Sequence, residues 1–171
     1  MSFLQGIDYQ PTVDAIIKLA DQLNPPSRRF LKGELVTLAL EKVTNGRLEF
    51  VDKEGYDCID TVTNEKYEVK SVADMFTDDK ITGRVSVSNS KKATLEKTFD
   101  YLLCVQSDPT KFAIAQLTWD EVEPNLVNKG GQFDLAKNVP VNTWITKVGD
   151  TEYRDLPPVK LDVRKLLESV L

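Results

Sequence analysis

The stretch that decides the fold of this chain is GYDCIDTVTNEKYEVKS, residues 55–71. Its first half places Asp57 and Asp60 among apolar residues, and its second half places Glu68 and Lys70 two positions apart. The polar residues 63–65 between the two halves are typical of a turn. The pattern predicts a hairpin, with strands at 56–62 and 66–71, that carries carboxylates and an amine where strands usually carry Val, Ile or Tyr.

The segments around this hairpin predict a single α/β domain with a mixed central sheet. Helical spacing of apolar residues predicts helices at 11–23 and 27–43, which Pro25 and Pro26 separate. A strand at 48–52 precedes the hairpin and completes a three-strand meander. The elements expected after the hairpin are a short strand at 84–88, a helix at 90–98, strands at 99–106 and 111–117, a helix at 120–126, a loop at 128–138, a strand at 142–148 and a closing helix at 161–171. This order of elements is typical of an α/β domain.

Composition limits the chemistry that the chain can perform. The 171 residues are enough for one domain with a sizeable core, and none of them is histidine. Ser-His-Asp and Cys-His catalysis and His-ligated zinc are therefore excluded. The two cysteines stand in apolar runs, which is typical of reduced core residues. We find no signal-like N-terminal pattern and no apolar run near the ~20 residues of a membrane helix, so we expect a cytoplasmic protein without a membrane partner.

Basic residues are concentrated in one part of an otherwise acidic chain. The formal net charge of −5 argues mildly against a nucleic-acid partner, although a net charge describes an average surface and not a cleft. Residues 80–97 contain five basic side chains and one acidic side chain: Lys80, Arg84, Lys91, Lys92, Lys97 and Glu96. A basic segment directly after a cluster of carboxylates needs an explanation, and for a charge run considered alone the favoured one is a solvated helix face.

The length of the predicted turn decides which aspartate faces Glu68. Side chains directly opposite each other on antiparallel strands share a face, with Cβ atoms ~5 Å apart. A two-residue connection places Asp57 opposite Lys70 and diagonal to Glu68. A three-residue connection places Asp60 opposite Glu68. Both registers bring an aspartate, a glutamate and a lysine together at one end of the sheet.

Two carboxylates at such a separation repel each other unless a positive charge lies between them. Oxygen ligands without histidine or thiolate favour Mg²⁺, for which Mn²⁺ can substitute. A magnesium site with two carboxylates leaves room for water and a substrate phosphate, and an amine beside it suits phosphodiester hydrolysis. The sequence therefore predicts a metal-dependent hydrolytic site on the hairpin.

The hairpin resembles the PD-(D/E)xK nuclease superfamily, in which an Asp on one strand is followed by Glu-x-Lys on the next. GYDCID and EKYEVKS resemble in particular the PvuII-like branch of the type II restriction endonucleases, and the likeness extends over residues 54–123. The resemblance implies a restriction-endonuclease-like core of a helix, a three-strand meander, a helix and a further strand.

The same resemblance implies roles for individual residues. Asp57 and Glu68 would bind the metal ion through their carboxylates, and Val69 would bind it through its backbone carbonyl. Lys70 would position or deprotonate the attacking water. Asp60 is the alternative metal ligand, because the turn is one residue longer here than in the family. Glu34 resembles an acidic residue that many members carry on the first core helix.

These roles predict a Mg²⁺-dependent, sequence-specific endonuclease that cuts double-stranded DNA to 5′-phosphate and 3′-hydroxyl ends. The alternatives are a structure-specific, phage or homing nuclease, such as a Holliday junction resolvase, and a non-catalytic DNA-binding subunit. We expect residues 1–171 to form one nuclease domain, with the catalytic core at 27–126 and a C-terminal extension at 127–171. Residues 1–26 are predicted to be helical and to contribute to a homodimer, because one active site cuts one strand.

The resemblance also implies a role for the basic segment that follows the strand with Glu68 and Lys70. At the matching place the PvuII-like enzymes carry histidines that read bases in the major groove. The predicted DNA-binding residues are Arg84, Ser86, Ser88, Asn89, Ser90, Lys91 and Lys92. Asn89 can bond adenine bidentately, and Arg84 or Lys91 can reach guanine. The alternative is a polar turn whose lysines contact only phosphates.

Overall fold

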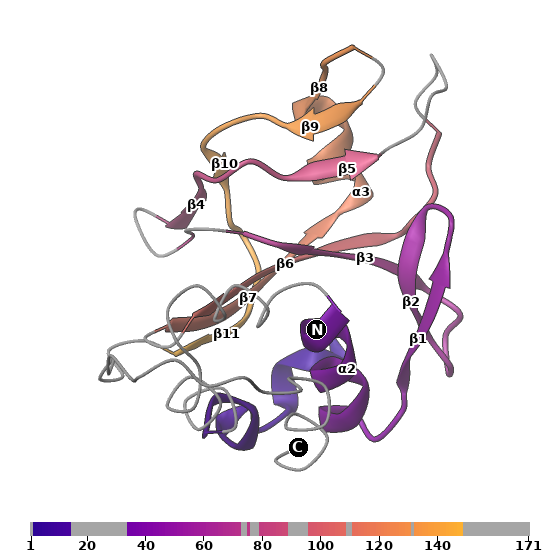
Figure 1. Cartoon of the computed structure of the whole chain (residues 1–171), viewed down its shortest axis with the longest axis vertical. Coiled ribbons are helices and arrows are strands. Elements are labelled where there is room, and N and C mark those ends of the chain that lie inside the picture. Colours follow the sequence, from indigo (N-terminus) through magenta and orange to yellow (C-terminus); the bar gives the residue numbers. More distant parts are fainter. Residues whose placement is uncertain are drawn as a thin grey trace, which may run out of the picture.

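A six-stranded mixed sheet forms the centre of the computed structural model, which describes residues 2–14, 34–72, 75, 79–88, 96–108, 111–130 and 132–148. Its strand order is β1-β2-β3-β6-β7-β11 (Figure 1). The strands are β1 (Leu48–Lys53), β2 (Tyr56–Asp60), β3 (Lys66–Ser71), β6 (Tyr101–Asp108), β7 (Lys111–Thr118) and β11 (Trp144–Val148). The protein is thus a mixed α/β structure in which strands predominate.

The predicted three-strand meander is present as β1, β2 and β3, which pair antiparallel in chain order. Strand β6 then returns parallel to β3, and β7 and β11 extend the sheet with antiparallel pairs. The parallel β3–β6 pair requires a crossover between the two strands. The chain between Ser71 and Tyr101 makes this connection, and it includes the basic segment.

The central sheet is covered on both faces. One face packs against helix α2 (Glu34–Val43), with Val36 and Leu40 of the helix in the same apolar cluster as Tyr67 and Leu103 of the sheet. The opposite face carries a second apolar cluster that includes Leu102. Burial on both faces explains why β6, LLCVQ in its central part, is almost continuously apolar.

A second layer of short strands and helical turns covers the face opposite α2 (Figure 1). A three-stranded antiparallel sheet in the order β5-β9-β8 and the pair β10-β4 make up its strands. Their bounds are β4 (Lys80–Ile81), β5 (Ser86–Ser88), β8 (Leu126–Asn128), β9 (Phe133–Leu135) and β10 (Val139–Pro140). The helical turns α3 (Trp119–Val122) and η4 (Glu123–Asn125) follow β7, and a capping box of Thr118 and Glu121 begins α3.

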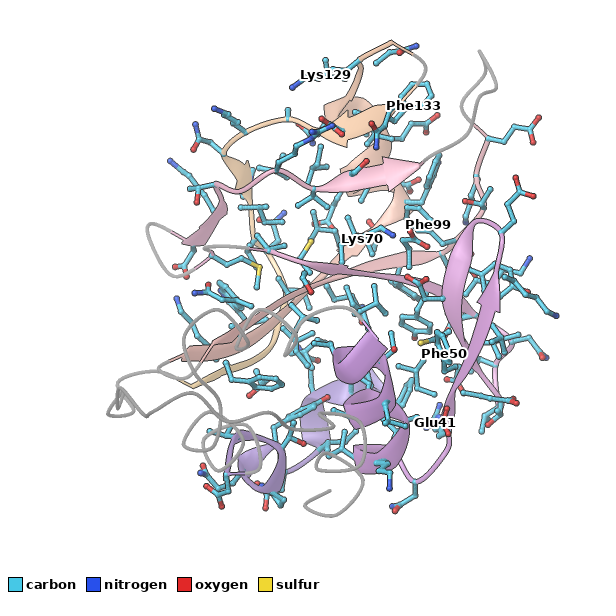
Figure 2. All side chains as sticks on the ribbon, in the orientation of Figure 1. Glu41, Phe50, Lys70, Phe99, Lys129 and Phe133 are labelled. Carbon is cyan, nitrogen blue, oxygen red and sulfur yellow. The ribbon has the colours of Figure 1, made fainter. Side chains whose placement is uncertain are left out.

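The outer edge of β1 is bonded by side chains from α2 and from the turn that follows it. Thr44 Oγ1 accepts a hydrogen bond from the backbone N–H of Leu48 at 3.1 Å. Glu41 Oε2 accepts one from the backbone N–H of Phe50 at 3.0 Å. The helix and the edge strand are therefore joined by polar contacts as well as by the core, and Figure 2 shows Glu41 and Phe50 at this junction.

Several expected elements differ in the structure. The loop predicted at 128–138 contains β9 and the end of β8, because strands of three residues are too short to show a periodic pattern. Strand β2 ends at Asp60 and not at residue 62, because the chain turns there. Residues 96–98 of the helix predicted at 90–98 are not helical, and the rest of that helix lies outside the described residues.

The N-terminal segment begins with η1 (Phe3–Gly6) and becomes helical at residues 10–14. Val13 is buried in the same cluster as Leu4 and Tyr9. This part of the helix predicted at 11–23 thus packs on the core, while residues 15–33 and the closing helix at 161–171 lie outside the described residues. Homodimerisation stays a prediction. Within the described residues, no helix is long and apolar enough to span a bilayer.

Gly55, in the β1–β2 turn, lies close to Thr98 in the chain just before β6. We expect replacement of Gly55 to cause an unusually large loss of unfolding free energy. Its φ is +96°, and a Cβ atom there would lie 2.7 Å from Thr98 Cβ. Gly46 also has a positive φ, +77°, but a Cβ there would meet no atom within 4 Å. Gly46→Ala should cost roughly 1–2 kcal/mol of unfolding free energy from backbone strain. Gly55→Ala should cost about 1–3 kcal/mol more, because it also forces overpacking.

Urea denaturation of both variants measures this difference. Adding Thr98→Gly should remove the excess cost from Gly55→Ala and leave the Gly46→Ala value unchanged. Equal losses in the two alanine variants would show that the contact with Thr98 does not constrain the turn.

Candidate active site

The candidate site lies where β2 and β3 stop pairing. Their ladder pairs Ile59 with Lys66 and Cys58 with Tyr67, so the next position places Asp57 opposite Glu68. At this position the strands are no longer paired in the ladder. The side chain of Asp57 bonds β3 there, because its Oδ2 accepts a hydrogen bond from the backbone N–H of Val69 at 2.8 Å. The two carboxylates predicted to bind metal therefore lie side by side.

This register differs from both of those considered from the sequence. Asp57 was expected opposite Lys70, or else Asp60 opposite Glu68. The hydrogen-bonded pair that closes the turn is Asp60 and Glu65, so the turn contains residues 61–64. Asn64 completes it in the left-handed region, with φ +63°. Thr61 and Val62 look like strand residues in the sequence, and this is why the turn was expected to be shorter.

Lys70, also on β3, contacts the Glu68 carboxylate. Glu68 and Lys70 are two residues apart and share a face, and Lys70 Nζ forms a salt bridge with Glu68 Oε1. Their partners on the parallel strand β6 are Leu102 and Cys104, which belong to the apolar cluster beneath the second layer. The carboxylate of Glu68 is thus held between a lysine, an aspartate and an apolar surface, and Figure 2 shows Lys70 between the two layers.

Burial dominates the electrostatics of Glu68, whose side chain is only 7% exposed. Loss of water raises the pKa of Glu68, the salt bridge with Lys70 opposes this shift, and the neighbouring Asp57 carboxylate raises the pKa further. The net direction is upward. A second positive charge placed between the two carboxylates would stabilise both of their ionised forms.

Asp60 has a separate, structural environment. Its carboxylate accepts hydrogen bonds from Arg47 Nε at 3.1 Å and Arg47 Nη2 at 2.9 Å, and from the backbone N–H of Val62 at 2.8 Å. Burial alone would raise the pKa of Asp60, but the bonds from Arg47 and Val62 hold it below its usual value. Asp60 therefore secures the turn, and it does not lie beside Glu68.

The residues present fit a magnesium ion held mainly by water and phosphate. Asp57 and Glu68 offer two adjacent carboxylates, and Mg²⁺ commonly uses one or two together with substrate oxygens. The part of the chain described here holds no cluster of three or more His, Cys, Asp or Glu side chains that could bind a metal ion by themselves. The carbonyl of Val69 stays a predicted ligand. Glu34 is the first residue of α2, on the helix that covers the other face of the sheet.

The predicted DNA-binding segment begins beside the site. Strand β5, which contains Ser86 and Ser88, contacts β3. Arg84 precedes β5, and its Nε donates to Asp134 Oδ2 at 2.8 Å. The guanidinium of Arg84 thus has a carboxylate partner within the chain, and a contact of Arg84 with DNA stays a prediction. Asn89, Ser90, Lys91 and Lys92 lie outside the described residues.

Sequence reasoning missed two polar residues that organise this region. Asp134 pairs with Arg84, and Gln132 Nε2 donates a hydrogen bond to Ser86 Oγ. Both lie in the segment that was expected to be a loop. An aspartate between Phe133 and Leu135 was the available signal, because a carboxylate flanked by large apolar residues needs a cationic partner when it is buried.

Similarity to other proteins adds no information about this site. No protein-family model matches the chain, and comparisons with curated proteins and with solved structures find no significant match. The functional assignment therefore rests on the residues and their geometry.

The opposite environments of Glu68 and Asp60 predict opposite effects of pH on stability. A raised folded-state pKa means that the stability due to Glu68 is lost as pH rises through that pKa. Glu68→Gln cannot ionise, so its unfolding free energy should increase relative to wild type as pH rises above the ordinary glutamate pKa. Asp60 has a lowered pKa, so its contribution is present above the ordinary aspartate pKa and is lost as pH falls. Asp60→Asn should therefore be most destabilising at neutral pH and approach wild type in acid.

Urea denaturation from acidic pH, below the ordinary aspartate pKa, up to mildly alkaline pH tests both variants as a matched pair. A Glu68→Gln difference that stays constant with pH would show that burial does not perturb Glu68 in the way described.

Proposed function

We propose that the protein is a Mg²⁺-dependent DNA endonuclease of the restriction type, with Asp57, Glu68 and Lys70 as its catalytic residues. The observation that carries the proposal is the placement of Asp57 directly opposite Glu68, with Lys70 paired to Glu68. This brings together two oxygen ligands and an amine at one end of a rigid sheet. All three side chains come from two neighbouring strands, so small movements of loops do not separate them.

The topology also supports a restriction-endonuclease-like core. A three-strand meander, a crossover and a strand parallel to β3 occur in the expected order, with α2 before the meander. The predicted helix of the crossover lies outside the described residues in its larger part, so the proposal relies on the strands and on α2.

The proposed roles of Asp57 and Glu68 follow from the surroundings of each carboxylate. Asp57 is oriented by the backbone N–H of Val69, which leaves its second oxygen, Oδ1, available as a metal ligand. Glu68 shares the site and gains most from an added cation, because it is the buried member of the pair. A bound Mg²⁺ would supply positive charge to the phosphodiester and to the water that attacks it.

Lys70 is half-exposed and can orient the attacking water or accept its proton. The water oxygen forms a bond to phosphorus, the bond from phosphorus to the 3′ oxygen breaks, and the departing oxygen takes up a proton. The products are a 5′-phosphate and a 3′-hydroxyl. A bound Mg²⁺ would offset the charge of Glu68 and weaken its salt bridge to Lys70. The Lys70 ammonium would then have to lose one proton to solvent before it could act, as the neutral amine, in accepting the proton of the attacking water.

Cleavage of plasmid DNA tests the assignment. Asp57→Asn, Glu68→Gln and Lys70→Ala should each reduce Mg²⁺-dependent cleavage by roughly 10²-fold or more, because each removes a ligand or the proton-transfer group. Lys66→Ala is the matched control: Lys66 is exposed on the same strand and face, and its removal should leave cleavage within about threefold of wild type. Asp60→Asn should lower stability while it leaves cleavage at permissive temperature largely intact.

Metal binding supplies an independent readout. Mg²⁺ should raise the melting temperature of wild type and of Lys66→Ala, and should have a much smaller effect on Asp57→Asn, because only a ligand bound to the folded state stabilises it. Discrete plasmid fragments support a restriction-type enzyme, while cleavage of branched DNA alone indicates a junction nuclease. Absence of cleavage on linear, plasmid and branched DNA with either Mg²⁺ or Mn²⁺ would overturn the proposal.

A further inference from the structure

Two cationic side chains converge on one buried carboxylate in the second layer. Asp134 on β9 is 2% exposed, and its Oδ2 lies 2.8 Å from Arg84 Nε and 3.8 Å from Lys129 Nζ. Arg84 comes from the chain before β5, whereas Lys129 comes from the turn of the β8–β9 hairpin. Three segments thus contribute to one cluster, and we call Arg84, Lys129 and Asp134 the Arg84 cluster.

The Arg84 cluster is hydrogen-bonded at its base and exposed at its surface. Arg84 Nη2 makes longer contacts of 3.4 Å to Asp134 Oδ1 and Gln132 Oε1, which fix the plane of the guanidinium. The hairpin turn is closed by a hydrogen bond of 2.7 Å from the N–H of Lys129 to the carbonyl of Gln132, and Gly130 occupies the left-handed region. The side chains of Arg84 and Lys129 nevertheless remain 66% and 61% exposed.

The charges of the Arg84 cluster do not cancel. Burial alone would raise the pKa of Asp134, but Arg84, with Lys129 and Ser86 adding to its effect, holds that pKa below the usual value. Asp134 is therefore ionised at neutral pH and contributes one negative charge against two positive charges. An excess of one positive charge is left on two exposed, prepositioned cations, although the chain as a whole carries a formal net charge of −5.

We propose that Arg84 and Lys129 bind the phosphate backbone of the DNA on which the active site acts. This proposal rests on the proposed nuclease function, and it assigns part of the DNA-binding surface to the second layer. Strand β5 connects the two places, because it begins two residues after Arg84 and contacts β3, which carries Glu68 and Lys70. Figure 2 shows Lys129 at the outer end of the same layer.

The geometry favours phosphate over a base edge as the target. Bidentate recognition of guanine needs two adjacent N–H groups of one guanidinium. In Arg84, Nε and Nη2 donate to Asp134, and Nη2 also donates to Gln132 Oε1, so both the Nε/Nη2 edge and the Nη1/Nη2 edge of the guanidinium are engaged through Nη2. The remaining Nη1 and the exposed ammonium of Lys129 suit single charged contacts to phosphate oxygens, which position DNA without reading its sequence.

The test measures binding of a fluorescent DNA duplex in Ca²⁺, an ion expected to support binding without cleavage, at about 50 to 200 mM salt. Removal of one phosphate contact should reduce the slope of log K against log salt by about 0.9. The ratio of wild-type affinity to Lys129→Ala affinity should accordingly be about 3.5-fold smaller at 200 mM salt than at 50 mM salt. The loss should be the same for duplexes of unrelated sequence.

Lys42→Ala is the matched control, since Lys42 is an exposed lysine at the end of α2, which covers the opposite face of the sheet. It changes the net charge equally and should leave the slope unchanged. Arg84→Lys keeps a cation next to Asp134, so the fold is preserved, and it should retain the slope. Arg84→Ala leaves Asp134 with Lys129 alone, so its folding is checked by circular dichroism before binding is measured.

The outcomes separate this proposal from the proposed activity. If wild type cleaves DNA but Lys129→Ala and Lys42→Ala have the same salt slope as wild type, the phosphate contact is wrong and the nuclease assignment stands. If Lys129→Ala reduces the slope in a protein that binds DNA and never cleaves it, the contact is correct and the nuclease assignment is wrong. A Lys129→Ala loss confined to one DNA sequence would show that the cluster reads bases, and would overturn the proposal.

Discussion

The register of the β2–β3 hairpin determines where every group of the candidate site lies. Residues on a strand alternate between faces, so a shift of one position would move Asp57 away from Glu68 and to the other face of the sheet. The turn at residues 61–64 prevents that shift, and Asp60 secures the turn through Arg47 and Val62. One aspartate of the hairpin therefore fixes the position at which the other can act.

The site combines two features that oppose stability. A ladder ends early at Cys58 and Tyr67, and a carboxylate is buried next to another carboxylate. The side chain of Asp57 compensates for the first by bonding the N–H of Val69, and Lys70 compensates for the second in part. Natural proteins commonly tolerate such local conflicts at functional sites while the surrounding sheet supplies the stability. Here the apolar clusters on both faces of β6 supply it.

Alternation along the strands was enough to predict the meander, the shared face of Glu68 and Lys70, and the buried character of β6. It could not decide between Asp57 and Asp60, because the choice depends on Arg47, a partner 13 residues from Asp60 in the sequence. The β8–β9 hairpin was missed for a related reason: its three-residue strands carry too little periodicity, and they are held by pairing with β5. The pairing of Arg84 with Asp134 was not predicted, because the two residues are 50 positions apart in the sequence.

The hydrogen bonds from Glu41 and Thr44 to β1 have a consequence for how the molecule meets its neighbours. An open edge strand is a template on which a strand of another chain can add, and such addition leads to unwanted assembly. The outward N–H groups of Leu48 and Phe50 are already bonded by side chains of the same chain, so a foreign strand would have to displace a hydroxyl and a carboxylate before it could pair. Side chains of the protein itself therefore protect this edge of the sheet against pairing with a strand of another chain. The side chain of Phe50 can then stay partly exposed while its backbone N–H is not offered to another chain.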